Sequence, residues 1–240
     1  AAAVAGCRVV YHLAAAYSTR PEEIDRMYQV NVRGTLNLLL AARDAGVGRI
    51  VHTSTVGTIG RPPDGSIPDE SAPFNLWDAS HYVRSKLFGE LIARTMADAG
   101  LPVVVVHPTA CVGPEDVAPS ATGRRLLAFL RGRWLPYPEG GVNFVPVADV
   151  VQGMVAAAER GRVGGRYILG RAGGNLDERA YLALMERISG RSAPARPRTG
   201  LWARLRGRTE RPRHLPQALT ADPTLAIREL GMPQSDLERA

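Results

Sequence analysis

The chain has 240 residues, of which 45% are hydrophobic, and a formal net charge of +7. This length and hydrophobic content suffice for one large domain or two modest ones with a sizeable core, which excludes a disordered chain. No apolar run is long enough to span a bilayer, and two cysteines are too few for a disulfide framework, so a cytoplasmic protein is expected.

The excess positive charge is concentrated in residues 187–213, where nine arginines accompany a single acid, Glu210. Such a stretch can bind nucleic acid or an anionic membrane surface, or it can be an arginine-rich solvated surface. Its aromatic content is limited to Trp202 and no nucleic-acid motif accompanies it, which favours the solvated surface. We therefore expect no nucleic-acid partner, and membrane contact anchored by Leu201, Trp202 and Leu205 is the minor alternative.

Residues 8–13 form a short apolar run that is typical of a buried parallel strand. Ala14 and Ala15 follow, and small residues there either let a ligand approach the carboxyl end of the strand or make a tight connection. A helix is predicted over 21–46, with Asn31 on its apolar stripe. Because a buried amide needs partners, we expect Asn31 to clamp neighbouring backbone, which can include a loop that touches a ligand.

Two further strands and a second long helix are predicted in the same alternating order. They are a strand over 49–53, a helix from Asp78 or Ser80 to Gly100, and a strand over 103–106. The first of these strands leads into a turn of hydroxyls and glycines over 54–60. Strands alternating with long helices predict an α/β fold with a parallel sheet and right-handed crossovers.

Beyond about residue 111 the pattern becomes shorter and less regular. The predicted elements are helices over 121–131, 149–160 and 177–188 and strands over 143–147 and 167–169. This alternation predicts a smaller α+β part that lies over the strand ends of the main sheet.

Lys86 is the only lysine among 30 basic side chains, the others being arginine. A compact ammonium can approach a phenol and a sugar hydroxyl together, which the planar fork of arginine cannot. Tyr82 lies four residues earlier, so the two side chains share one face of a helix. The cation would lower the pKa of the phenol towards neutrality and make it a general acid/base. Taken alone, the pair is also consistent with an ordinary helix surface.

Five motifs follow one another along the chain. They are His12-Leu13-Ala14-Ala15, Asn31-Val32-x-Gly34-Thr35-x-Asn37-Leu38-Leu39, Thr53-Ser54-Thr55, Tyr82-x-x-Ser85-Lys86, and His107-Pro108-Thr109 with Val112-Gly113-Pro114. Together they resemble the extended short-chain dehydrogenase/reductases, and most of all the NAD-dependent epimerase/dehydratase group, including hopanoid-associated sugar epimerase-like and dihydroflavonol reductase-like proteins. The resemblance covers residues 1 to about 190 and 222–231. It implies a Rossmann-type doubly wound parallel sheet.

The resemblance also implies roles for individual residues. Tyr82 would be the general acid/base, Lys86 would lower its pKa and hold the nicotinamide ribose, and Thr55 would hydrogen-bond the substrate oxygen, with Ser54 as second choice. The cofactor would be NAD or NADP, and no metal is implied. The residues implied to contact the cofactor are Leu13, Ala14, Ala15, Asn31, Thr53, Tyr82, Lys86, His107 and Pro108. At His107 the family more commonly has asparagine.

The implied function is epimerisation or dehydration of a nucleotide-sugar or related sugar by Tyr-assisted hydride transfer. The alternatives are an NADPH-dependent ketone reductase of the dihydroflavonol type and a non-catalytic cofactor-binding member of the fold. The presence of Thr55, Tyr82 and Lys86 together favours catalysis. A small-molecule substrate is expected, and a homodimer is left open.

One part of the family pattern is not found. The glycine-rich phosphate turn is absent, since Gly46-x-Gly48 follows a predicted helix and precedes a strand. We therefore expect 1–110 to be a partial NAD(P)-binding domain that lacks its glycine-rich first half. Residues 111–240 would be mainly substrate-binding, with 143–160 returning to the dinucleotide-binding core. The chain alone would then be inactive, with the strand at 8–13 as an exposed sheet edge.

Overall fold

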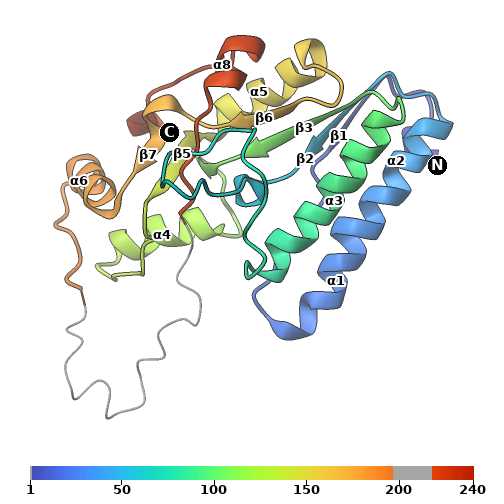
Figure 1. Ribbon diagram of the computed structural model, residues 1–240. Coiled ribbons are helices and arrows are strands. Elements are labelled where there is room, and N and C mark those ends of the chain that lie inside the picture. The colour runs from blue at the N-terminus through green and yellow to red at the C-terminus, as the bar shows by residue number, and fades with distance from the viewer. Residues whose placement is uncertain (1, 197–217) are drawn as a thin grey trace.

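The computed structural model describes residues 2–196 and 218–240. Its main sheet has four parallel strands in the order β1-β2-β3-β6 (Figure 1). These strands are β1 (Val9–His12), β2 (Arg49–Thr53), β3 (Val103–Pro108) and β6 (Arg166–Leu169). The parallel sheet with helices on both faces confirms the α/β, Rossmann-type fold class.

The strands are apolar on both sides because helices cover both faces of the sheet. Val103 and Val105 pack towards α2 (Thr35–Asp44) and α3 (His81–Asp98). Val104 and Val106 point the other way, into a cluster with residues of α5 (Val147–Arg160) and α8 (Thr224–Leu230). This alternation follows from the two-residue period of a strand, and it yields the three layers visible in Figure 1.

The helix predicted over 21–46 exists, but its middle is wound differently. It begins with η2 (Pro21–Glu23) and α1 (Ile24–Tyr28), continues as a π-helical turn, η3 (Gln29–Gly34), and ends with α2. The π-helical turn packs against α3 where α3 has Gly89, and a Cβ at Gly89 would lie 2.5 Å from the carbonyl oxygen of Asn31. A glycine is therefore required for the two helices to approach this closely.

A second, smaller sheet carries the rest of the chain. It contains β4 (Ala110–Val112), β5 (Val142–Pro146) and β7 (Asn175–Leu176), in that order. The helices α4 (Ala121–Leu130) and α6 (Glu178–Ser189) flank it, around a cluster that includes Phe129, Tyr137, Phe144 and Tyr181. The remaining short helices are η1 (Ala2–Val4), η4 (Val56–Thr58), η5 (Ala172–Gly174) and η6 (Leu237–Arg239).

The strand over 167–169 differs from its predicted place in the smaller part. As β6 it pairs with β3 in parallel, with Val106 opposite Tyr167, and so completes the described main sheet. The preceding α5 packs on β2, β3 and β6, whereas β5 belongs to the smaller sheet. The chain therefore crosses from one sheet to the other at Pro146, the last residue before α5.

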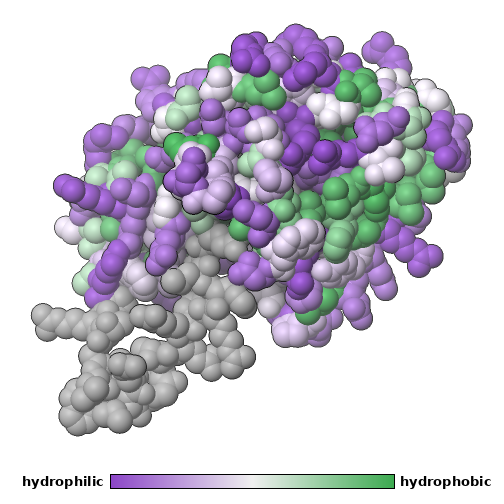
Figure 2. All heavy atoms as spheres, in the orientation of Figure 1, coloured by the Kyte–Doolittle hydropathy of each residue, from purple (hydrophilic) through white to green (hydrophobic). Residues whose placement is uncertain are grey.

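Strand β1 forms one edge of the main sheet within the described residues, paired with β2 alone. Its side chains Val9 and Tyr11, and Leu13 just after it, are 38%, 42% and 53% exposed. Further apolar side chains gather over α2 and α3 (Figure 2), whose exposed residues include Leu36 and Phe88. The main sheet thus has an accessible apolar border.

The basic stretch is described only in part. Arg187 and Arg196 form ion pairs with Glu238 and Glu178, and Arg191 donates a hydrogen bond to the carbonyl oxygen of Leu130 (2.8 Å). The residues proposed as membrane anchors, and all of 197–213, lie outside the described residues. Within the described ranges, no helix is both long and apolar enough to cross a membrane.

Candidate active site

The candidate site lies where β1, β2 and β3 end and α3 begins. The side chain of Ser80 accepts a hydrogen bond from the backbone nitrogen of Val83 (3.4 Å), so α3 starts at His81. Tyr82 and Lys86 therefore occupy the first two turns of α3, on one side of the helix. Carboxyl ends of parallel strands are where open α/β sheets bind ligands.

Lys86 is buried beside β2. Its ammonium donates a 2.6 Å hydrogen bond to the carbonyl oxygen of Thr53, the last residue of that strand. Burial lowers the pKa of Lys86 to about 8, and the negative charge of Glu90 opposes this effect. The ammonium retains two further N–H groups for a ligand.

Tyr82 is half-buried, and its ring packs edge-on against the ring of Tyr17, with 4.9 Å between the centroids. Burial raises the pKa of Tyr82 to about 12, with smaller contributions in the same direction from Tyr17 and Cys111. The expectation that Lys86 lowers this pKa is therefore wrong for the structure described. The physical reason is that burial penalises the phenolate while the ammonium is engaged by Thr53.

The two hydroxyls after β2 have different surroundings. Ser54 is buried and its Oγ donates a 2.7 Å hydrogen bond to Oε2 of Glu90. Thr55 is half-buried, and its Oγ1 accepts a long hydrogen bond (3.3 Å) from the backbone nitrogen of Gly57. The proton of the Thr55 hydroxyl is thus left for a ligand. This arrangement supports the preference for Thr55, whose catalytic role stays a prediction.

Asn31 is 1% exposed and clamps two segments together. Its side-chain oxygen accepts from the backbone nitrogen of Ala16 (2.7 Å), and its nitrogen donates to the carbonyl oxygen of Ala16 (2.9 Å) and to Oγ of Ser85 (2.9 Å). The loop after β1 is thereby fixed to α3. On that loop Ala14 and Ala15 are exposed beside the site, as a surface approached by a cofactor requires.

His107 lies below the surface of the site. It is fully buried at the end of β3, and its Nε2 is 3.0 Å from Oε2 of Glu90. The structure therefore does not bring this side chain to the position implied for a nicotinamide contact, whereas Pro108 is half-buried. Glu90, which sequence reasoning missed, has a recognisable signal, because it lies four residues after Lys86 on the same helix face.

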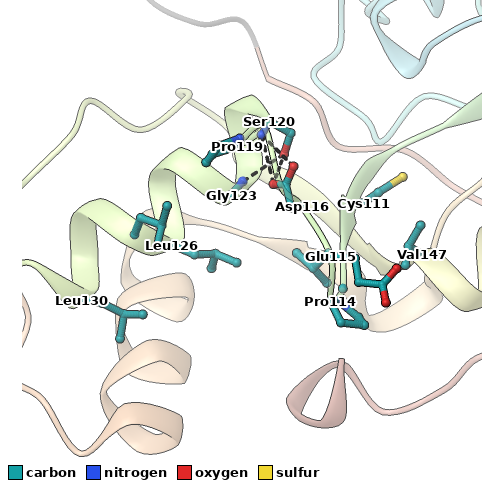
Figure 3. Close-up of a pocket in the computed structure, with 13 residues that line it drawn as sticks. Cys111, Pro114, Glu115, Asp116, Pro119, Ser120, Gly123, Leu126, Leu130 and Val147 are labelled. Atoms are coloured by element: carbon teal, nitrogen blue, oxygen red, sulfur yellow. Dashed lines mark hydrogen bonds between the residues drawn. The ribbon is translucent and has the colours of Figure 1, made fainter.

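A cavity of about 480 Å³ opens between β4 and α4. Figure 3 shows Cys111 and Val147 on one side of this cavity and Leu126 and Leu130 of α4 on the other. Cys111, which lines this cavity, also contributes to raising the pKa of the Tyr82 phenol, whereas Tyr82 itself is not among the lining residues. The cavity is large enough for a small substrate, and Cys111 relates it to the candidate acid/base.

The fold and the cofactor-facing residues fit the nicotinamide half of a dinucleotide site. Small exposed residues follow β1, the ammonium of Lys86 has donors to spare, and Oγ1 of Thr53 is buried with no hydrogen-bond partner among the described residues. These features, together with the parallel sheet, define an extended short-chain dehydrogenase/reductase.

Comparison with known proteins gives the family. Residues 1–170 match the sequence model of the NAD dependent epimerase/dehydratase family. The chain is 35% identical to a putative dihydroflavonol 4-reductase of Synechocystis sp., over 98% of this chain and 74% of the relative. It is 36% identical to sterol demethylase protein B of Methylococcus capsulatus, over 80% of this chain and 58% of the relative. The chain therefore belongs to the NAD-dependent epimerase/dehydratase family.

A solved structure supports the same placement. A nucleoside-diphosphate-sugar epimerase from Pseudomonas aeruginosa superimposes with a TM-score of 0.79 and 27% identity, over 99% of this chain and 74% of that one. The family description names NAD as the cofactor. The chain spans 74% and 58% of the lengths of these two curated relatives.

Proposed function

We propose that the full-length protein interconverts a carbinol and a carbonyl with NAD or NADP, using Tyr82 as general acid/base. The observation that carries the proposal is the convergence of two segments at one strand end. The turn with Thr55 packs against Val83 through Gly57, next to Tyr82, while Lys86 reaches back to Thr53. A non-catalytic module has no need of this combination.

The bound nicotinamide would supply or accept the hydride at its ring. Tyr82, protonated because its pKa is about 12, gives its proton to the substrate oxygen as the carbonyl is reduced, and takes it back in the reverse direction. The ammonium of Lys86, which donates one hydrogen bond to the carbonyl oxygen of Thr53 and has two further N–H groups, holds the ribose of the cofactor. The Thr55 hydroxyl donates to the substrate oxygen and orients it.

We take the cavity between β4 and α4 as the substrate site, and its lining favours a neutral, largely apolar substrate. The described residues that line it include leucines, valines and prolines, with Glu115 and Asp116 as the charged members and no lysine or arginine. A diphosphate bound there would lack a cationic partner, and carboxylates would repel it. We therefore place the ketone reductase first, although the resemblance alone had favoured a nucleotide-sugar epimerase or dehydratase.

The sugar-nucleotide function is the second candidate, supported by the likeness to the Pseudomonas epimerase. The two are separated by following nicotinamide absorbance in full-length protein, with aromatic and alicyclic ketones in one series and sugar nucleotides in the other. Stoichiometric NADPH loss with a ketone supports the reductase. Sugar interconversion or dehydration without net nicotinamide change supports the second candidate, and turnover in neither series would refute the proposal.

A further inference from the structure

A buried carboxylate lies one helical turn beyond Lys86. Glu90 is 1% exposed, and its Oε2 accepts hydrogen bonds from Ser54 Oγ and Thr58 Oγ1, both at 2.7 Å. Ser54 and Thr58 stand on either side of Thr55, and the single hydroxyl proton of Thr58 is shared between Glu90 and the carbonyl oxygen of Thr55 (2.8 Å). One carboxylate on α3 therefore holds both ends of the turn that presents Thr55.

Two basic side chains on neighbouring strands lie against the carboxylate of Glu90. His107 Nε2 on β3 lies 3.0 Å from Oε2, and Arg166 Nε on β6 lies 3.0 Å from Oε1. Arg166 is itself fixed, since its guanidinium donates to the carbonyl oxygen of Glu70 (2.6 Å). Burial alone would raise the pKa of Glu90, but His107, Arg166 and the Ser54 hydrogen bond hold it well below its usual range. The carboxylate is thus ionised near neutral pH.

We propose that Glu90 is a positioning residue for catalysis, which fixes the Thr55 turn through Ser54 and Thr58 and stabilises the ammonium of Lys86 through its negative charge. The inference rests on the proposed function, in which Thr55 and Lys86 touch substrate and cofactor. Glu90 itself touches neither, because it is buried beneath the turn. It links the two segments that must converge at the site.

The effect of the Glu90 charge can be measured as a change in the pKa of Lys86. Among residues 2–196 and 218–240, the titratable groups that interact with Lys86 are His12 on β1, His52 on β2 and Glu90 on α3. The imidazoles are buried and have lowered pKa values, so they are neutral near pH 7. Glu90 is therefore the group that raises the pKa of Lys86 against burial.

Two substitutions separate the charge of Glu90 from its hydrogen bonds. Glu90→Gln keeps an amide oxygen that can accept from Ser54 and Thr58 but removes the charge, whereas Glu90→Leu removes both. Asp149→Asn is the matched control, since Asp149 is a buried carboxylate on α5 that accepts from the backbone and side chain of Ser235. It lies outside the site.

The direct measurement is an NMR titration of the 240-residue chain grown with lysine labelled with ¹³C at Cε. Because the chain has one lysine, the spectrum reports Lys86 without assignment. We expect a pKa of about 8 in the unsubstituted chain and in Asp149→Asn. Glu90→Gln should have a lower value, and in full-length protein the alkaline limb of the pH–rate profile should move down with it.

The second readout is kcat in full-length protein. Glu90→Leu should lose about 100-fold, as expected when a catalytic group is displaced by about 1 Å, whereas Glu90→Gln measured below the lysine pKa should keep most of its kcat. Thr55→Val and Glu90→Leu together should cost little more than the larger single loss. Additive losses, or an unchanged lysine pKa in Glu90→Gln, would overturn the proposal. Absence of turnover in the unsubstituted protein would instead refute the proposed function, and the NMR result would still decide the role of Glu90 towards Lys86.

Discussion

We assign different roles to the adjacent hydroxyl residues Ser54 and Thr55, because Ser54 is buried and Thr55 is only half-buried. The hydroxyl of Ser54 donates a hydrogen bond to Glu90 in the interior, whereas the hydroxyl of Thr55 remains able to donate to a ligand. A hydroxyl that already donates a hydrogen bond to a buried anion cannot donate to a substrate without breaking that bond, which has a large free-energy cost. We therefore assign Ser54 a structural role.

This division predicts opposite outcomes for two substitutions. Thr55→Val should lower kcat by about 100- to 1,000-fold, as for the loss of one donor to a developing oxyanion, with little change in Tm. Ser54→Ala should lower stability by about 1–3 kcal/mol, because Glu90 loses a buried hydrogen bond, with a milder effect on kcat. Thermal melts and steady-state kinetics of both variants test this. The reverse order would mean that Ser54 is the substrate-binding hydroxyl.

The phenol of Tyr82 is the second test at this scale. Tyr82→Phe should retain cofactor binding and lose about 100- to 10,000-fold in turnover, because the proton donor is gone while the ring still fills its site. Tyr17→Phe is the control, since it keeps the edge-on ring contact with Tyr82. Calorimetry with the cofactor and initial rates measure the two effects. Near-normal rates in Tyr82→Phe would remove Tyr82 from the mechanism.

At the residue level, the candidate catalytic side chains could be predicted from the sequence, but their burial and pKa values could not. Tyr82 and Lys86 could be paired by helical spacing, and they do share one side of α3. The pKa of Tyr82 could not be predicted in this way, because burial and the engagement of Lys86 by a backbone carbonyl depend on the folded chain. The burial of His107 escaped prediction for the same reason.

At the scale of elements, the close contact between η3 and α3 determines how the site is held. The π-helical turn carries Asn31, whose amide clamps the loop after β1, and Gly89 lets α3 come against it. π-helical turns are often found at functional sites. Here the turn puts the amide of Asn31 within reach of both the loop and Ser85.

Gly89→Ala should therefore destabilise the protein by about 1–3 kcal/mol, the usual cost of overpacking, because its Cβ would lie 2.5 Å from the carbonyl oxygen of Asn31. Gly34→Ala is the matched control. The nearest atom to its Cβ is 3.6 Å away and its backbone is helical, so a small gain in stability is expected. Denaturant unfolding of both variants decides, and equal stabilities would contradict the tight contact.

Elements with a strong periodic signal were predictable and short ones were not. The β-branched runs of β2 and β3 and the capped helix α3 are visible in the sequence. Strands β4 and β7 have three and two residues, too few for any period to emerge. The sheet to which β6 belongs depends on its pairing with β3, which is a long-range contact without a local signal.

At the scale of the whole molecule, two buried imidazoles make stability sensitive to acid. His12 on β1 and His52 on β2 lie with ring centroids 5.2 Å apart. Burial, with a smaller contribution from the charge of Lys86, lowers the pKa of His12 to about 4 and that of His52 well below 6.5. Both must be neutral in the folded chain, whereas both become protonated in the unfolded chain as the pH falls through 6.5.

The contribution of these histidines to the free energy of unfolding should therefore be fully present above about pH 6.5 and decrease as the pH falls towards 5. The shift of His12 alone corresponds to a loss of roughly 2 kcal/mol between pH 7.5 and 5. Glu70, whose pKa is raised by burial, acts in the opposite direction, so the comparison with His12→Gln isolates the histidine. Denaturant unfolding at several pH values should give a flatter dependence for His12→Gln. Identical slopes would show that His12 is not neutral in the folded state.

The single lysine has a consequence for proteolysis. A protease that cleaves only after lysine has one target in these 240 residues, and the target is 4% exposed within a helix. Cleavage would give pieces of 86 and 154 residues (240 − 86) and would require α3 to open. When opening and closing are fast compared with cleavage, the digestion rate measures the free energy of that opening. The rate of digestion at Lys86 would thus measure local unfolding of the helix that carries Tyr82 and Lys86.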